Sequence, residues 1–120
     1  MQGTSLAGRT ILIVEDEPLI ALDIAAAFAK AGAVTFCART LSEAIHMVEQ
    51  DGLSAAVLDF GLGAEDAAAV CGRLEKRSIP FVLHSGYKHA SDACRSGTVV
   101  PKPADPIKLV DAVGQLVGRH

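Results

Sequence analysis

Residues 55–63 have the sequence Ala55-Ala56-Val57-Leu58-Asp59-Phe60-Gly61-Leu62-Gly63. This apolar run does not alternate with polar residues, and it ends in one carboxylate and two glycines. Such a run between turn signals is typical of a strand covered on both faces, as in the parallel sheets of α/β proteins. Asp59 would then lie at the carboxyl end of a central strand, where open parallel sheets bind ligands. Taken alone, Asp59 fits a turn residue before Gly61 equally well, so its role depends on the other strands.

The rest of the chain alternates between strand and helix patterns. Apolar runs predict strands at residues 10–14, 34–38, 55–59, 79–83 and 98–100. Helical spacing predicts helices at 18–31, 41–50, 67–74 and 106–117, and the short polar segment 88–95 supports a marginal helix at most. The alternation predicts an α/β fold, a (βα)5 doubly wound parallel sheet with helices on both faces. The reason is that each right-handed crossover lays its helix on the sheet.

Three of the predicted helices carry a start signal. Pro18 suits the first position of a helix because its missing N–H would have no partner there. Thr40 and Glu43 have the spacing of a capping box, in which both side chains satisfy free amides. Asp105 precedes Pro106 and caps the last helix in the same way.

The composition indicates one globular domain. The chain has 120 residues, of which 50% are hydrophobic and 21% charged, and this is enough for a single core. We expect residues 1–120 to form that domain, residues 1–8 to be flexible, and no output domain to be present. The formal net charge of −3 favours neither nucleic acid nor a membrane surface as a partner.

The three cysteines are Cys37, Cys71 and Cys94. Their odd number, wide spacing and lack of a C-x-x-C pattern argue against a disulfide framework and against a zinc site. We therefore expect small apolar fillers in a reduced, cytoplasmic protein.

Polar residues follow four of the predicted strands. The first strand ends at Glu15 and Asp16, the third at Asp59, the fourth at Ser85 and the fifth at Lys102. Because the carboxyl ends of parallel strands share one edge, these groups are expected in one crevice. Acids so close raise one another's pKa unless a cation joins them, and hard oxygen ligands favour Mg²⁺. Mg²⁺ and Lys102 would spread the charge of a phosphoryl group while Asp59 attacks as the nucleophile.

With these motifs in this order, the chain resembles a bacterial two-component response-regulator receiver domain over its whole length. The matching pieces are Ile11-Leu12-Ile13-Val14-Glu15-Asp16-Glu17-Pro18, Val57-Leu58-Asp59, Ser85-Gly86-Tyr87 and Lys102-Pro103. The resemblance implies a CheY-like, flavodoxin-like sheet with strand order 2-1-3-4-5. It also implies that Asp59 is the phosphoacceptor and that Ser85 and Lys102 bind phosphoryl oxygens. The implied Mg²⁺ ligands are Glu15, Asp16, Asp59 and the backbone carbonyl of Gly61.

Four residues depart from the usual pattern or modify it. Glu15 replaces the usual aspartate. Neighbouring side chains in a strand face opposite sides of the sheet, so Glu15 and Asp16 can both face the site only if the strand has ended before them. Val99 replaces the Tyr or Phe that switches in many receivers, so we expect residues 86–97 to carry the switch. Tyr87 is a candidate modulator that shields the acyl phosphate or packs in its loop. His84 is a candidate donor or pH-sensitive group, or an incidental loop residue.

The expected function is that of a single-domain response regulator, which is not an enzyme acting on a separate substrate. Pro80-Phe81 and Ser85-Gly86-Tyr87 resemble the receiver subgroup with a Phe-Ala-Thr-Gly-type motif, associated with HWE-type histidine kinases. The implied partners are such a sensor kinase or a phosphotransfer protein, and an unknown downstream protein. The first helix is expected to bury Ile20 and to present Leu19 and Leu22 to a partner.

Three alternatives stay open at this point. A degenerate receiver would bind proteins without phosphorylation, and Glu15 favours this reading because it weakens the metal site. A phosphatase of the haloacid-dehalogenase type also forms an aspartyl phosphate, but it wants a second acid where this chain has Gly61. A flavodoxin-like flavin binder wants a hydroxyl-rich loop after the first strand, where this chain has acids.

Overall fold

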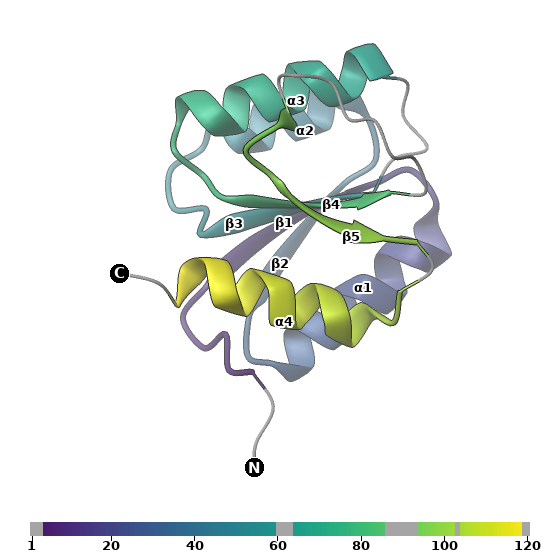
Figure 1. The fold of residues 1–120 in the computed structure, drawn as a ribbon, viewed down its shortest axis with the longest axis vertical. Helices are drawn as coiled ribbons and strands as arrows, with labels where there is room; N and C mark the ends of the chain where they lie inside the picture. The colour runs from purple at the N-terminus through teal and green to yellow at the C-terminus, as the bar shows by residue number, and fades with distance from the viewer. Residues whose placement is uncertain (1–3, 60–63, 86–93, 103, 119–120) are drawn as a thin grey trace.

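The computed structural model describes residues 4–59, 64–85, 94–102 and 104–118, with the backbone alone at 64–67 and 85. Five parallel strands form one sheet in the order β2-β1-β3-β4-β5, and helices cover both of its faces (Figure 1). The predicted α/β class, the doubly wound architecture and the strand order are confirmed.

The elements in chain order are β1 (Thr10–Glu15), α1 (Pro18–Lys30), β2 (Val34–Ala38), α2 (Leu41–Val48), β3 (Ala55–Asp59), α3 (Ala64–Lys76), β4 (Phe81–Ser85), β5 (Thr98–Pro101) and α4 (Pro106–Val117). Most of the segment expected to hold a marginal helix, residues 86–93, lies outside the described residues. Three strands end later than predicted, and β5 extends by one residue to Pro101. β1 includes Glu15, and β4 runs through His84 to Ser85.

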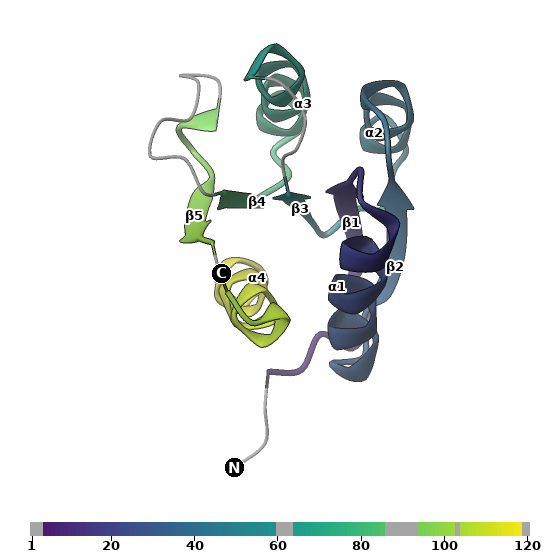
Figure 2. The same cartoon turned by 90° about the vertical axis from the view of Figure 1, so that its right-hand side faces the viewer.

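Alternate side chains of the strands fill two apolar cores, one on each face of the sheet. α2 and α3 cover one face (Figure 2), and its strand residues are Leu12, Val14, Ala38, Ala56, Leu58, Phe81 and Leu83. α1 and α4 cover the other face, and its strand residues are Ile11, Ile13, Ala55, Val57 and Val82. We call these the α2/α3 core and the α1/α4 core.

The helix starts have the predicted caps. The hydroxyl of Thr40 accepts a hydrogen bond from the Glu43 amide at 3.1 Å, and the Glu43 carboxylate accepts one from the Arg39 amide at 2.7 Å. Asp105 accepts a hydrogen bond from the Ile107 amide at 3.0 Å. None of the helices in the described part of the chain has the length and apolar character needed to traverse a bilayer.

Thr4 and Leu6, which belong to the segment expected to be flexible, contact the rest of the domain. Leu6 is fully buried in the α1/α4 core, and its amide donates to the Ala31 carbonyl at 2.7 Å. The hydroxyl of Thr4 donates to Asp111 of α4 at 2.6 Å. An apolar side chain at the open end of the core thus fastens this segment between α1 and α4.

The apolar stripe of α1 differs from the predicted one. Ala21 is buried, as are Ile24 and Phe28, whereas Ile20 is 42% exposed. The prediction that Ile20 belongs to the core face was wrong. The face of α1 that packs on the sheet contains the small Ala21 in its place. Leu19 and Leu22 are exposed, as expected.

A disulfide bond joins Cys71 to Cys94. The prediction of three unpaired cysteines was wrong, and Cys37 is an exposed thiol on β2 rather than a buried filler. Cys71 and Cys94 are 23 residues apart in sequence, but Cys94, which precedes β5, lies against Cys71 of α3, with their Cα atoms 5.0 Å apart. The spacing in the sequence therefore gave no signal of the pair.

Candidate functional site

Three polar side chains form a row across the carboxyl end of the sheet. Glu15 of β1 is in register with Asp59 of β3, which is in register with His84 of β4. Each lies two residues after a strand residue of the α1/α4 core, so strand alternation places all three on the same face. All three are buried, with 2%, 1% and 7% of their surfaces exposed.

The carboxylate of Asp59 is held by two cationic or donor groups. The ammonium Nζ of Lys102, which directly follows β5, lies 2.5 Å from Oδ1. Nδ1 of His84 lies 3.1 Å from the other oxygen, Oδ2. Oδ1 makes no hydrogen bond within the described residues, so its contact with Lys102 is an ion pair without hydrogen-bond geometry. The two oxygens of Asp59 therefore have different partners.

Glu15 lies beside Asp59 as a second buried acid. Its Oε2 accepts a hydrogen bond from the Glu17 amide at 2.8 Å. Burial first, and then contact with the Asp59 carboxylate, together raise the pKa of Glu15 to about 8. Glu15 therefore carries a proton over much of the neutral range when no cation is bound.

Asp16 does not join this row. β1 ends at Glu15, and Asp16 is exposed at the rim, although its carboxylate contributes to the raised pKa of Glu15. The structure thus brings together Glu15, Asp59 and Lys102, and leaves the third acid outside. The alternation of a strand explains the split, because Glu15 still belongs to the strand.

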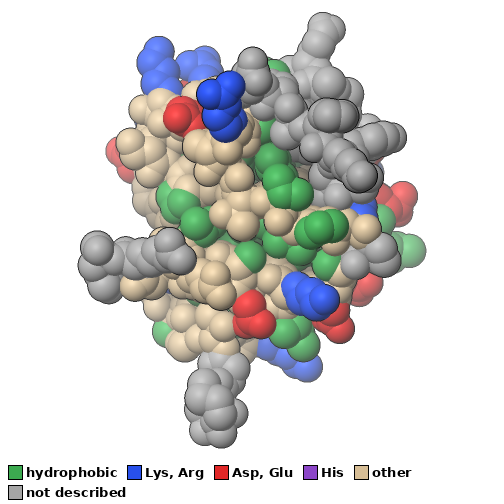
Figure 3. Space-filling view, viewed as in Figure 1, with side chains coloured by type: hydrophobic (Ala, Val, Ile, Leu, Met, Phe, Trp, Pro, Cys, Tyr) green, Lys and Arg blue, Asp and Glu red, His purple; other side chains and the backbone are tan. Residues whose placement is uncertain are grey.

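Of the other predicted site residues, the structure describes Val99 and the backbone of Ser85. Gly61 and Tyr87 lie outside the described residues. The backbone of Ser85 ends β4 and pairs with Pro101 of β5, so it lies at the same edge as the row. Val99 is half exposed on β5. Figure 3 shows hydrophobic side chains on the face of the molecule that is turned to the viewer in Figure 1.

His84 is a site residue whose position sequence reasoning misjudged. It was expected in a loop, but it belongs to β4 and contacts Asp59 directly. The available signal was the alternation beyond Val82, since His84 follows Val82 by two residues and so faces the same core. Because the strand was predicted to end at Leu83, the alternation was not extended to His84.

The buried acids fit a hard divalent cation. Oε1 of Glu15 is buried and has no hydrogen-bond partner among the described residues. A cation such as Mg²⁺ would satisfy this oxygen and remove the repulsion between Glu15 and Asp59. Over the described ranges, no three His, Cys, Asp or Glu side chains are placed so that they could hold a metal ion together. Asp16 would have to turn inward to complete the set.

We predict that the metal-free protein loses stability as the pH rises from about 5 to about 8. The pKa of Glu15 rises from 4.5 to about 8 on folding, so in this window the folded state keeps a proton that the unfolded state has lost. The free energy of unfolding then falls with pH, by at most about 1.4 kcal/mol per unit for one proton. Urea unfolding in EDTA at several pH values measures the slope.

Two variants test the assignment of that slope. Glu15→Gln should flatten it, because the titrating group is gone. Glu17→Gln changes an exposed neighbour and should leave the slope as in the wild type. An unchanged slope in Glu15→Gln would show that another group is responsible.

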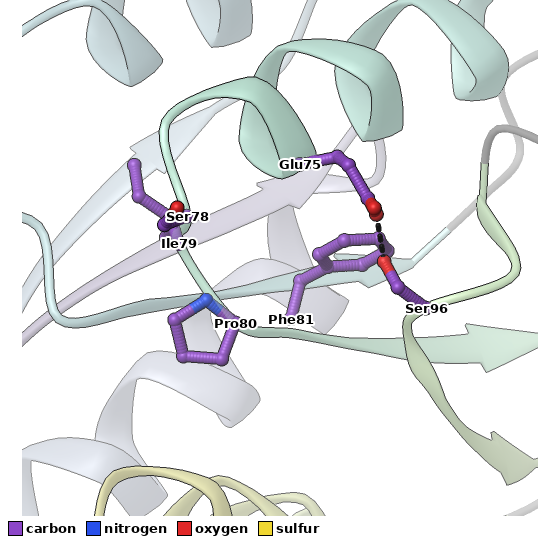
Figure 4. A pocket seen from close by; sticks show the side chains of 6 residues that line it. All are labelled: Glu75, Ser78, Ile79, Pro80, Phe81 and Ser96. Carbon is purple, nitrogen blue, oxygen red and sulfur yellow. Dashed lines mark hydrogen bonds between the residues drawn. The ribbon is translucent and has the colours of Figure 1, made fainter.

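An open pocket lies at the opposite edge of the sheet (Figure 4). It has a volume of about 300 Å³ and is lined by Glu75, Ser78, Ile79, Pro80, Phe81 and Ser96. Ser96 donates a hydrogen bond to Glu75, which links α3 to the turn before β5 (Figure 4). Because Phe81 is the first residue of β4, this pocket is separate from the row that contains Asp59.

Comparison with known families gives one match over most of the chain. A family model described as the response regulator receiver domain matches residues 11–114. No curated protein matches the sequence.

Several solved structures share the fold. The receiver domain of the sensor histidine kinase PA1611 from Pseudomonas aeruginosa PAO1 has a TM-score of 0.79 and 21% identity, and the match covers 94% of this chain and 100% of that one. That structure has a magnesium ion coordinated in its active-site cleft. The receiver domain of the Francisella response regulator 1452 has a TM-score of 0.78 and 23% identity, with 92% and 98% covered. A response regulator receiver protein from Sinorhizobium medicae WSM419 has a TM-score of 0.73 and 26% identity, with 95% and 98% covered.

Proposed function

The chain belongs to the family of response regulator receiver domains, and on this premise we propose that it accepts a phosphoryl group on Asp59. The observation that carries the proposal is the buried carboxylate of Asp59 with the Lys102 ammonium 2.5 Å from Oδ1. An ammonium in this place can pair with the oxygens of an arriving phosphoryl group, and burial protects an acyl phosphate from water.

The donor in this proposal is the phosphohistidine of a sensor histidine kinase or of a phosphotransfer protein. An oxygen of Asp59 attacks phosphorus, and the phosphorus–nitrogen bond breaks. Its electron pair goes to the leaving imidazole, which takes up a proton. Lys102 then pairs with a phosphoryl oxygen, and the hydroxyl of Ser85 donates to another. The motif from Pro80 to Tyr87 supports a kinase of the HWE type.

Glu15, Asp16 and Asp59 are the side chains that would hold Mg²⁺, together with the carbonyl of Gly61. When bound, the ion supplies positive charge to the phosphoryl oxygens during transfer. The unpartnered Oε1 of Glu15 supports this assignment, as does the magnesium ion in the Pseudomonas aeruginosa receiver domain.

Signal output would come from a protein contact. Val99 is not aromatic and is half exposed, so the proposed switch is a change in the region from β4 to β5 rather than the rotation of a ring. Leu19 and Leu22 on α1 are exposed apolar side chains suited to contact with a partner, and an open groove of about 540 Å³ lies between α1 and α4. The proposal places this exchange in the cytoplasm and assigns no separate substrate to the protein.

Transfer of labelled phosphate tests the proposal. The protein is incubated in Mg²⁺ with a phosphorylated HWE-type kinase and, separately, with acetyl phosphate. The expected product is an acyl phosphate, whose label is released by hydroxylamine because the carbonyl carbon is attacked. Label that resists hydroxylamine would contradict attachment to a carboxylate.

A phosphorylation-independent binding module is the second candidate function. The raised pKa of Glu15 favours it, because a protonated acid is a poor metal ligand. A folded protein that accepts no label from either donor in Mg²⁺ would support this alternative.

A further inference from the structure

We propose that His84 shortens the lifetime of the phosphoryl group on Asp59 by donating a hydrogen bond to Oδ2 of its carboxylate. This inference rests on the proposed function, since it concerns the fate of the phosphorylated residue. In this proposal His84, a residue of β4 beside Asp59, takes part in the hydrolysis of the acyl phosphate.

The contact between His84 and Asp59 is built into the sheet. β4 is the parallel neighbour of β3, and the two residues are in register at its carboxyl edge. Nδ1 of His84 lies 3.1 Å from Oδ2, with 7% of the histidine and 1% of the aspartate exposed. A carboxylate can only accept hydrogen bonds, so Nδ1 is the nitrogen that carries the proton. The other ring nitrogen, Nε2, is buried and has no partner among the described residues.

The same geometry selects the oxygen that reacts. Oδ2 is engaged by His84, whereas Oδ1 lies beside the Lys102 ammonium and makes no hydrogen bond within the described residues. Lys102 can serve both the carboxylate and the phosphoryl oxygens, so attack through Oδ1 keeps the new group next to a cation. Oδ2 then becomes the carbonyl oxygen of the acyl phosphate and keeps its place beside His84.

The hydrogen bond is stronger in the unphosphorylated state. Oδ2 carries about half of a negative charge in the free carboxylate but much less in the acyl phosphate, and hydrogen bonds to ionised acceptors are roughly twice as strong as neutral ones. In hydrolysis, water attacks phosphorus and the bond from phosphorus to Oδ1 breaks. The electron pair of that bond returns to the carboxylate. Inorganic phosphate leaves with the oxygen and one proton of the water, and the second proton passes to solvent. Negative charge thus grows on the carboxylate in the transition state, and His84 stabilises it there.

Phosphoryl half-lives test this role. The protein is labelled with acetyl phosphate in Mg²⁺ buffer, freed of donor by desalting, and followed as label is lost. His84→Ala is expected to lengthen the half-life about three- to tenfold, because one hydrogen bond to a developing charge is removed. His84→Leu should do the same while keeping the buried volume filled, which covers the case in which the alanine variant does not fold.

Two further variants separate hydrogen bonding from packing. His84→Asn retains an N–H donor near the position of Nδ1 and should restore the half-life to within about twofold of the wild type. His46→Ala removes an exposed histidine of α2 and should leave the half-life unchanged. Equal half-lives in the wild type and in His84→Leu would overturn the proposal. The proposal would also be overturned if the half-life were lengthened equally in His84→Leu and in His84→Asn, because the loss of packing would then explain both.

The contact itself can be measured without phosphorylation. Nitrogen-15 spectra of the histidine rings should show a proton on Nδ1 of His84, and its signal should shift in Asp59→Ala. A proton confined to Nε2 would overturn the inference and leave the proposed phosphorylation of Asp59 untouched. Absence of label on the wild type would instead defeat the proposed function, and the inference with it.

Discussion

Asp59→Asn is expected to lower the initial rate of phosphoryl acceptance by at least about 100-fold, because an amide oxygen is a poor nucleophile towards phosphorus. Asparagine has nearly the same volume as aspartate and its carbonyl can still accept from His84 or Lys102. The change therefore removes the chemistry of the buried carboxylate with little change in packing. Label from a phosphorylated kinase and label from acetyl phosphate measure the rate in the same Mg²⁺ buffer.

An exposed acid provides the matched control. Asp23 lies on the solvent side of α1, and Asp23→Asn makes the same chemical change away from the row of Glu15, Asp59 and His84. This variant should accept label at the wild-type rate. Equal labelling of Asp59→Asn and Asp23→Asn would show that the phosphoryl group is carried elsewhere.

Removal of the bond between Cys71 and Cys94 is expected to destabilise the protein by about 3 kcal/mol. The bond closes a loop across a sequence separation of 23 residues, and opening it returns conformational freedom to the unfolded chain. Both cysteines are buried, at 0% and 2% exposure. The midpoint of thermal unfolding should fall by roughly 10 °C in the double variant Cys71→Ala and Cys94→Ala. Circular dichroism measures this midpoint.

A dithiol reductant gives an independent measurement of the same bond. The reductant passes two electrons to the bond, leaves two thiols on the protein, and is itself oxidised to a disulfide. Wild-type protein with reductant should unfold near the midpoint of the double variant, whereas the exposed Cys37→Ala should unfold like the oxidised wild type. A wild-type midpoint that the reductant does not change would contradict a stabilising disulfide.

The fold was predictable because its signals are local. The buried run that ends at Asp59 indicates a covered parallel strand, and the caps at Thr40 and Asp105 mark helices through contacts within three residues. Asp59 and Lys102 could be brought together for the same reason. Parallel strands have one common carboxyl edge, whatever the details of the packing.

The missed features depend on where strands end and on which elements cross. His84 was assigned to a loop because the apolar run stops at Leu83, although the strand continues for two residues. Glu15 and Asp16 were treated as a pair, and the extra strand residue in β1 buries Glu15 while Asp16 stays exposed. The bond between Cys71 and Cys94 depends on a contact between α3 and the residues just before β5, and the number and spacing of the cysteines give no signal of that contact.

Thr4 and Leu6 fasten the start of the described chain to α4, its last helix, through a hydrogen bond between residues 107 positions apart and through the α1/α4 core. α4 is also the last of these elements to leave the ribosome during synthesis. Until it emerges, one face of β3 and β4 stays open to water, and closure over such a distance has a high entropic cost. A nascent chain should therefore complete this domain only once α4 has emerged, and until then chaperones have access to its central strands.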